Sequence, residues 1–139
     1  MAAEQFTHTI RVRYSECDPQ GHVFNANYLA YFDLAMTELW RELGGYSAMI
    51  DEGVDMVVAE ARLRYLAALG FDDEAALVVR SISLGNTSMT SELTIERGGE
   101  TVAECELRHV FVDTRGSGTV PIPDAIRSGL ERYAHGEGS

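Results

Sequence analysis

The sequence predicts an α+β fold in which one five-stranded antiparallel sheet wraps around one long central helix. One segment, residues 26–43, repeats its apolar side chains with the period of about 3.6 residues that is typical of a helix. The segments before and after it alternate apolar and polar residues, which is the pattern of half-buried strands. Gly85-Asn86 and Gly98-Gly99 separate later segments and indicate tight turns between antiparallel neighbours.

The first strand and the long helix are predicted from two different periods. Residues 6–14 form a half-buried strand in which Ile10, Val12 and Tyr14 share the apolar face. The helix runs over residues 26–43, and Gly44-Gly45 supplies the left-handed conformation that often ends a helix. The apolar stripe of this helix is expected to contain Leu29, Phe32, Ala35, Met36, Leu39 and Leu43.

The second half of the chain is predicted to be mainly strand. A short terminal helix over residues 124–133 and a frayed tail over residues 134–139 are expected to follow the last strand. We therefore expect a single domain across residues 1–139, with its core within residues 6–133. The four later strands are predicted over residues 54–65, 76–84, 87–97 and 101–113.

This arrangement predicts self-association. One helix covers only part of one face of a five-stranded sheet, and the edge strands keep unpaired backbone groups. Pairing of two subunits into a continuous sheet would satisfy one edge, and the uncovered face would allow further association. We therefore expect a homo-oligomer, either a dimer or a tetramer.

Composition excludes several classes of function. The chain has 22 acidic residues against 11 basic ones, all arginine, and a net charge of -11, so neither nucleic acid nor an anionic membrane is an expected partner. No apolar run approaches the ~20 residues that span a bilayer, and the first residues lack the pattern of a secretory signal. Cys17 and Cys105 have no metal-ligand spacing. We expect a cytoplasmic protein with reduced thiols, no metal and no cofactor.

The stretch from Asp18 to Tyr28 is the most informative part of the sequence. It connects the first strand to the helix, and it combines a carboxylate, the imidazole of His22 and the backbone N–H groups of a helix start. Such N–H groups have no intrahelical partner and attract negative charge. A carboxylate beside them favours acyl transfer or hydrolysis. The alternative is that Asp18 merely caps a turn before Pro19.

The same stretch resembles the hotdog-fold thioesterases, in particular the acyl-CoA thioesterases similar to 4-hydroxybenzoyl-CoA thioesterase. The specific part of the resemblance is an Asp-x-x-Gly-His-Val-x-Asn-x-x-Tyr pattern, which covers residues 18–28. The weaker parts are residues 13–17, 61–65, 72–73, 109–113 and 121–123, so that the likeness extends from about Thr7 to Tyr133. The resemblance implies a hotdog fold, in which the sheet wraps around the central helix.

The resemblance also implies the reaction and the place of the site. The catalytic carboxylate of the family corresponds to Asp18, acting as nucleophile or as general base. The oxyanion donor, a backbone N–H at the start of the helix, corresponds to Asn25. Members of the family form dimers with a ten-stranded sheet, often paired into tetramers, and their sites lie between subunits. The implied substrate is an acyl-CoA or another acyl-pantetheine thioester.

Other residues of the loop have two interpretations each. His22 either orients Asp18 or water and contacts the thioester, or it hydrogen-bonds the backbone of its own loop. Gly21 supplies a positive φ or allows close approach of the acyl group. Val23 and Tyr28 are the neighbouring candidates for substrate contact, and Tyr28 is also a candidate for packing. The side chain of Asn25 is a candidate cap of the helix.

Three further candidates lie outside the loop, each with a structural alternative. Glu60 is a possible second carboxylate of the site, although a solvated strand face is favoured. Thr87 and Ser88 offer hydroxyl groups near the substrate, or they are ordinary turn residues. His109 on the last predicted strand is expected to be a packed or interface histidine rather than a catalyst.

The sequence therefore predicts an acyl-CoA thioesterase that produces a free acid and the CoA thiol. An acyl-carrier-protein thioesterase is an alternative, but an acidic carrier protein is disfavoured by an acidic chain. A hotdog-type acyl-thioester dehydratase or hydratase is a second alternative, and a non-catalytic acyl-thioester-binding domain is a third. The candidates for contact with CoA phosphates are Arg62, Arg64, Arg80, Arg97 and Arg108.

Overall fold

The computed structural model describes residues 4–116 and 118–134, in which five strands form one antiparallel sheet with the order β1-β3-β4-β5-β2. The predicted frayed tail lies outside the described residues except for Ala134. Within the described ranges, no helix combines the length and the apolarity that crossing a membrane requires. The strands are β1 Phe6–Arg11, β2 Val54–Tyr65, β3 Glu74–Leu84, β4 Ser88–Arg97 and β5 Glu100–Asp113.

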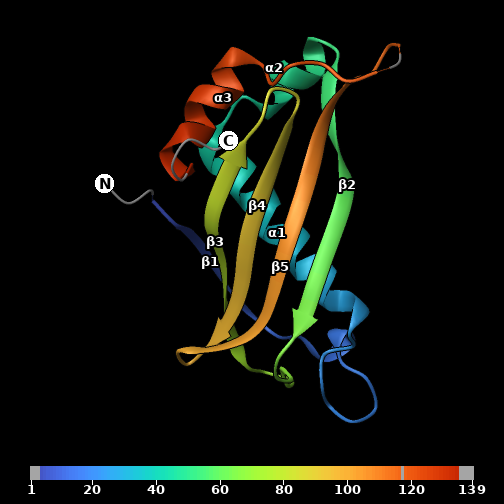
Figure 1. The fold of residues 1–139 in the computed structure, drawn as a ribbon. Coiled ribbons are helices and arrows are strands. Elements are labelled where there is room, and N and C mark those ends of the chain that lie inside the picture. Colours follow the sequence, from blue (N-terminus) through green and yellow to red (C-terminus); the bar gives the residue numbers. More distant parts are fainter. Residues whose placement is uncertain (1–3, 117, 135–139) are drawn as a thin grey trace.

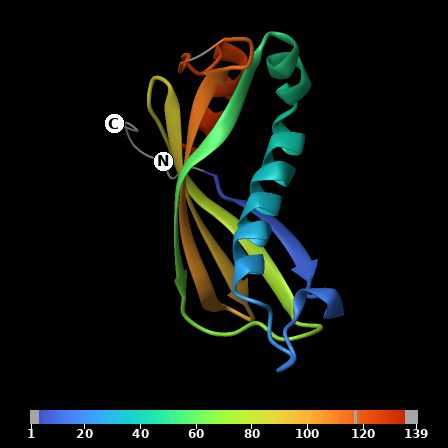
Figure 2. The ribbon, with the colours of Figure 1, turned by 90° about the vertical axis from the view of Figure 1, so that its right-hand side faces the viewer.

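The long helix α1, Ala26–Leu43, lies along one face of the sheet, and the sheet curves around it (Figures 1 and 2). Phe32, Ala35 and Leu39 are fully buried against the sheet, as the apolar stripe predicted. Leu29 is a correction, because its side chain is 40% exposed. Its neighbour Tyr28 is buried instead, which is possible because the Tyr28 hydroxyl has a hydrogen-bond partner within the fold.

The first strand is shorter than predicted. It ends at Arg11, and the chain then turns into the 3-10 helix η1, Tyr14–Glu16. The Arg13 backbone N–H and guanidinium both donate to the Glu16 carboxylate, which closes this turn. Tyr14 is consequently 80% exposed rather than buried, and its ring stacks edge-on against Phe71.

Two short helices cover the end of the sheet opposite to η1 (Figure 1). The helix α2, Tyr46–Asp51, was not predicted, since one and a half turns give too little period to detect. It begins after Gly45, which has a φ of 84°, in the left-handed region. The predicted terminal helix is present as α3, Asp124–Leu130, followed by the 3-10 helix η2, Glu131–Tyr133.

The strand β2 is one of the two edges of the sheet, and a register shift between Val58 and Glu60 interrupts its pairing with β5. Such a bulge changes which residues face α1. Val58 pairs with His109, whereas Glu60 pairs with Arg108, the preceding residue of β5. Since paired residues share a face and His109 lies on the α1 side, Glu60 turns to the outer face.

Candidate active site

The loop between η1 and α1 is a tight turn held by its own backbone. The Asp18 N–H donates to the His22 carbonyl at 2.8 Å, and the Gly21 N–H donates to the Asp18 carbonyl at 2.9 Å. Gly21 has a φ of 82°, which confirms the predicted positive φ, and no atom lies within 4 Å of a Cβ placed there. The requirement for glycine is therefore one of backbone conformation rather than of space.

The two oxygens of the Asp18 carboxylate have different surroundings. The Oδ1 atom accepts the backbone N–H groups of Gln20 at 2.9 Å and His22 at 3.2 Å. It therefore caps the turn, as the structural interpretation of this residue proposed. The Oδ2 atom accepts no hydrogen bond from the described residues, and Asp18 is only partly buried. One oxygen is thus fixed by the loop while the other stays available.

The start of α1 leaves backbone donors open beside this loop. The Asn27 N–H bonds the Phe24 carbonyl at 2.8 Å, and the Tyr28 N–H bonds the Asn25 carbonyl at 3.2 Å. The N–H groups of Asn25 and Ala26 donate to no residue in the described part of the chain. The Asn25 side chain does not cap the helix. These two free donors lie at the positive end of the helix dipole.

Glu16 ties the loop to the helix. Its carboxylate accepts the Tyr31 hydroxyl at 2.7 Å as well as the groups of Arg13, and its carbonyl accepts the Asn27 Nδ2 at 2.9 Å. Burial tends to raise the pKa of Glu16, but the hydrogen bonds from Arg13 and Tyr31 outweigh burial and lower the pKa below its usual value. Glu16 is therefore a charged anchor of the loop.

The other predicted residues of the loop divide into exposed and packed ones. The His22 side chain is exposed and forms no hydrogen bond or ion pair with the described residues. Val23 is buried in the core, and its N–H donates to the Leu69 carbonyl. Tyr28 is also buried: its hydroxyl accepts the Leu69 N–H at 3.0 Å, and its ring packs edge-on against Tyr65 at 5.2 Å. Within one chain, Val23 and Tyr28 are therefore core residues that hold the loop in place.

The candidates outside the loop do not join it within one chain. Glu60 lies on the outer face of the sheet, where its carboxylate contacts Arg62 at 3.3 Å. Thr87 and Ser88 lie at the turn between β3 and β4, which is at the opposite end of the sheet from Asp18 (Figure 1). The Thr87 carbonyl accepts the Phe111 N–H there.

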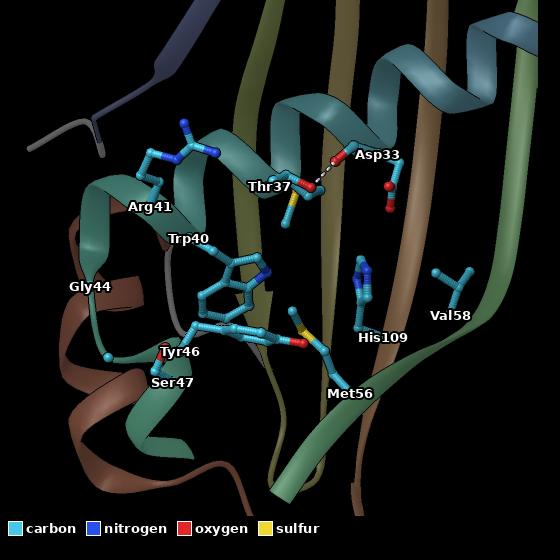
Figure 3. A pocket seen from close by; sticks show the side chains of 12 residues that line it. Asp33, Thr37, Trp40, Arg41, Gly44, Tyr46, Ser47, Met56, Val58 and His109 are labelled. Atoms are coloured by element: carbon cyan, nitrogen blue, oxygen red, sulfur yellow. Dashed lines mark hydrogen bonds between the residues drawn. The ribbon is translucent and has the colours of Figure 1, made fainter. Parts of the chain in front are cut away.

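A cavity of about 570 Å³ opens along the C-terminal half of α1, and the sequence did not predict it. Figure 3 shows Trp40 and Tyr46 on one side of it and His109 on the other. A partial signal was present, because Asp33, Thr37 and Trp40 repeat at helical spacing on one face of α1. The cavity is lined by Asp33, Met36, Thr37, Trp40, Arg41, Gly44, Gly45, Tyr46, Ser47, Met56, Val58 and His109.

His109 is buried, as predicted, and forms part of the cavity wall from β5. Burial lowers the pKa of this imidazole, and the nearby Asp33 carboxylate opposes that effect without cancelling it. His109 is consequently neutral near pH 7. The cavity thus presents aromatic rings, methionine side chains and a neutral imidazole, together with the charged side chains of Asp33 and Arg41 and the hydroxyl groups of Thr37 and Ser47.

Most arginines proposed for CoA phosphates already have carboxylate partners. Arg64 contacts Glu104 at 3.1 Å on the outer face, and Arg97 contacts Asp73 at 3.0 Å. Arg62 and Arg80 are paired in the same way. Within residues 4–116 and 118–134, Arg108 is the exception among the five candidates, since its side chain forms no ion pair or hydrogen bond.

Comparisons with known proteins match both the sequence and the fold. The profile of the thioesterase-like superfamily matches residues 12–130. The acyl-CoA thioester hydrolase YbgC of Escherichia coli is 30% identical over 110 residues, which cover 78% of this chain and 82% of that protein.

Solved structures show the same fold. A gentisyl-coenzyme A thioesterase superposes with a TM-score of 0.79 at 27% identity, over 89% of this chain and 98% of the other. A hypothetical protein of Staphylococcus aureus in complex with CoA superposes with a TM-score of 0.87 at 16% identity, over 96% and 85% of the two chains, which supports the fold alone. The five-stranded sheet around α1 and the match over residues 12–130 place the chain in the thioesterase-like superfamily with a hotdog fold.

Proposed function

We propose that the protein hydrolyses acyl-CoA thioesters, with Asp18 as the reactive carboxylate and the N–H of Asn25 as the oxyanion donor. The observation that carries this proposal is that one loop contains both an available Asp18 Oδ2 and the open N–H groups at the start of α1. The similarity to an acyl-CoA thioester hydrolase supports the same reaction.

The chemistry needs few groups because a thiolate is a good leaving group. Asp18 attacks the thioester carbonyl to form an acyl anhydride, or it removes a proton from an attacking water molecule. In both routes negative charge develops on the carbonyl oxygen, and the Asn25 N–H stabilises that charge. The His22 backbone N–H holds Asp18 Oδ1, so the contribution of His22 to this mechanism comes through its backbone.

We also propose that a second copy of the chain completes each site. Trp40 follows Asn25 by fifteen residues, so the far part of the cavity lies roughly 22 Å along α1 from the oxyanion donor. The strand β2 ends at Tyr65, whose hydroxyl contacts the Asn25 carbonyl, so β2 runs opposite to α1. Antiparallel pairing of β2 with β2 of a second copy would bring the loop of one copy to the cavity of the other.

The exposure of β2 supports this pairing. It is an edge strand of 12 residues, and Val57, Val58 and Tyr65 expose large parts of their apolar side chains. Long exposed edges with apolar side chains are rare in proteins that stay monomeric. The acyl group would then enter the cavity of one subunit while Asp18 of the other attacks the thioester.

The experiment is a thiol-release assay with a panel of acyl-CoA thioesters. We expect Asp18→Asn to lower kcat by about 10²–10⁴-fold with an unchanged thermal midpoint, because the amide can neither attack nor accept the proton. The matched control is Asp72→Asn, the same change at an exposed neighbouring acid whose φ of 71° an asparagine tolerates. Near-normal thiol release by Asp18→Asn would refute the assigned role.

A further inference from the structure

The side chain of Tyr65 reaches from the end of β2 to the start of α1. Its hydroxyl donates to the Asn25 carbonyl at 3.2 Å. Tyr65 is the last residue of β2 and pairs with Ala103, which fixes its backbone beside β5. Its ring packs edge-on against the buried ring of Tyr28, with the ring centroids 5.2 Å apart. The direction of the hydroxyl is therefore set by the sheet and by the packing against α1.

The Asn25 carbonyl does not need the Tyr65 hydroxyl as a hydrogen-bond partner. It already accepts the Tyr28 N–H at 3.2 Å, although a carbonyl oxygen has a second lone pair to offer. Tyr65 is 53% exposed, so water can pair with its hydroxyl. Because neither group would be left buried and unpaired without the other, this hydrogen bond should contribute little to stability. Its consequence lies in the peptide group that accepts it.

This peptide group carries one of the two open donors at the start of α1. The Asn25 carbonyl and the Ala26 N–H belong to the same planar unit. A hydrogen bond to the carbonyl fixes the plane of the unit and polarises it, which makes its N–H a stronger donor. Asn25 has helical dihedral angles, a φ of -59° and a ψ of -31°. The N–H groups of Asn25 and Ala26 therefore point in nearly the same direction, out of the start of the helix.

We infer that Tyr65 is a positioning residue of the oxyanion site, and that the Ala26 N–H is the second donor of that site beside the Asn25 N–H. This inference rests on the proposed function, in which the thioester carbonyl oxygen lies at the start of α1. The Tyr65 hydroxyl orients the Ala26 N–H toward that oxygen and strengthens the donor while negative charge develops there. Tyr65 acts through the peptide and does not contact the reacting atoms.

The first test is Tyr65→Phe, which keeps the ring against Tyr28 and removes only the hydroxyl. We expect kcat for thiol release from the best acyl-CoA of the panel to fall by about three- to tenfold, which is less than direct loss of an oxyanion donor costs. KM should stay within about twofold, because the stabilised charge develops only in the transition state. The thermal midpoint should stay the same, since the lost hydroxyl is exposed.

Tyr14→Phe is the matched control. The ring of Tyr14 packs edge-on against Phe71, as that of Tyr65 does against Tyr28. Tyr14 is also exposed, but its hydroxyl forms no hydrogen bond with the described residues. The variant therefore loses the same group from a similar environment, and its kcat and KM should equal those of the wild type.

A spectroscopic measurement separates positioning from a purely structural effect. Infrared difference spectra are recorded for butyryl-CoA and benzoyl-CoA, each with ¹³C at the thioester carbonyl, bound to Asp18→Asn. Hydrogen bonds from the N–H groups of Asn25 and Ala26 should lower the carbonyl stretching frequency below that of the free thioester. Adding Tyr65→Phe should return the frequency part of the way to the free value, whereas adding Tyr14→Phe should leave it unchanged.

The outcomes distinguish this inference from the proposed function. An unchanged carbonyl band after addition of Tyr65→Phe would overturn the inference, whatever happens to kcat, and thiol release by the wild type would leave the hydrolase intact. Absence of thiol release by the wild type from every acyl-CoA of the panel would refute the proposed function. The inference would still be supported in that case if Asp18→Asn shifts the band and Tyr65→Phe partly reverses the shift.

Discussion

The two ends of α1 differ in how their polar groups are satisfied. At the N-terminal end, the loop around Asp18 is exposed, and hydrogen bonds from Gln20 and His22 fix one oxygen of its carboxylate. At the C-terminal end, the cavity wall mixes aromatic rings and methionines with polar side chains, and two buried nitrogens in that wall have no partner among the described residues. Under the proposed function, the first end carries out the reaction and the second end receives the acyl group.

If the proposed function is correct, this difference means that neither end alone is a complete site. The Asp18 carboxylate beside open N–H groups does not line the cavity, and the carboxylate that does line it, Asp33, forms no side-chain hydrogen bond with the described residues. Because β2 runs opposite to α1, a two-fold partner that pairs along β2 would place unlike ends together. The proposed division of the site between the ends of one helix is thus an argument for the proposed dimer.

The largest expected effect is complementation between two inactive variants. Asp18→Asn removes the reactive group, and Thr37→Trp fills the cavity from an exposed position on α1. Each variant alone should be nearly inactive. If the site combines the loop of one copy with the cavity of another, assemblies that hold one copy of each variant should regain about half of the wild-type rate.

The measurement is thiol release by assemblies co-expressed with two different affinity tags and purified on both. Assemblies of Asp18→Asn alone and of Thr37→Trp alone, carried through the same steps, are the controls. Mixed assemblies that remain as inactive as their parents would show that one chain supplies both the loop and the cavity of a site. The two ends of α1 would then not be halves of a shared site.

The next effect compares the two edges of the sheet. Val57 on β2 is 49% exposed, and a lysine there should prevent edge pairing, since charged side chains on an edge strand oppose association. We expect Val57→Lys to halve the mass measured by light scattering and to lower kcat/KM by tenfold or more. Thr7→Lys places the same charge on the other edge strand, β1, and should change neither quantity.

The sequence predicted the loop end of α1 better than the cavity end. The bounds of α1 and the positive φ of Gly21 follow from local signals, namely helical period and turn chemistry. The cavity joins α1 and α2 to β2 and β5, so its wall depends on contacts that no local pattern records. The helix α2 was missed for a different reason, because its six residues give too little period to detect.

The wrong predictions also have local causes. Tyr14 continues the alternation of β1, but the hydrogen bonds between Arg13 and Glu16 turn the chain before that residue. Leu29 fits the apolar stripe, although the helix rotates so that Tyr28 faces the sheet. The solvated face favoured for Glu60 is present, but its cause, the bulge after Val58, was not predicted, since alternation from Val58 would point Glu60 inward. The period of apolar residues in a sequence indicates that a helix or strand exists, but it does not fix which of its side chains face the core.

The smallest expected effect concerns the polar network that distinguishes the loop end from the cavity end. Tyr31→Phe removes the 2.7 Å hydrogen bond to Glu16, and near pH 7 it should lower the free energy of unfolding by about 1–2 kcal/mol. The pKa of Glu16 is lowered in the folded state, so its contribution is present above the unfolded pKa and is lost as the pH falls through the folded pKa. The difference between wild type and Tyr31→Phe should therefore shrink below about pH 4.

Urea unfolding at several pH values between neutral and acidic measures this difference. Tyr133→Phe is the control, because Tyr133 is similarly buried but its hydroxyl forms no hydrogen bond with a carboxylate of the described residues. Its effect on stability should be independent of pH over the same range. A pH-independent difference for Tyr31→Phe would mean that its hydroxyl does not stabilise the charged form of Glu16. The loop would then be held by its backbone hydrogen bonds alone, and the contrast between a polar loop end and an apolar cavity end would rest on Asp18 rather than on Glu16.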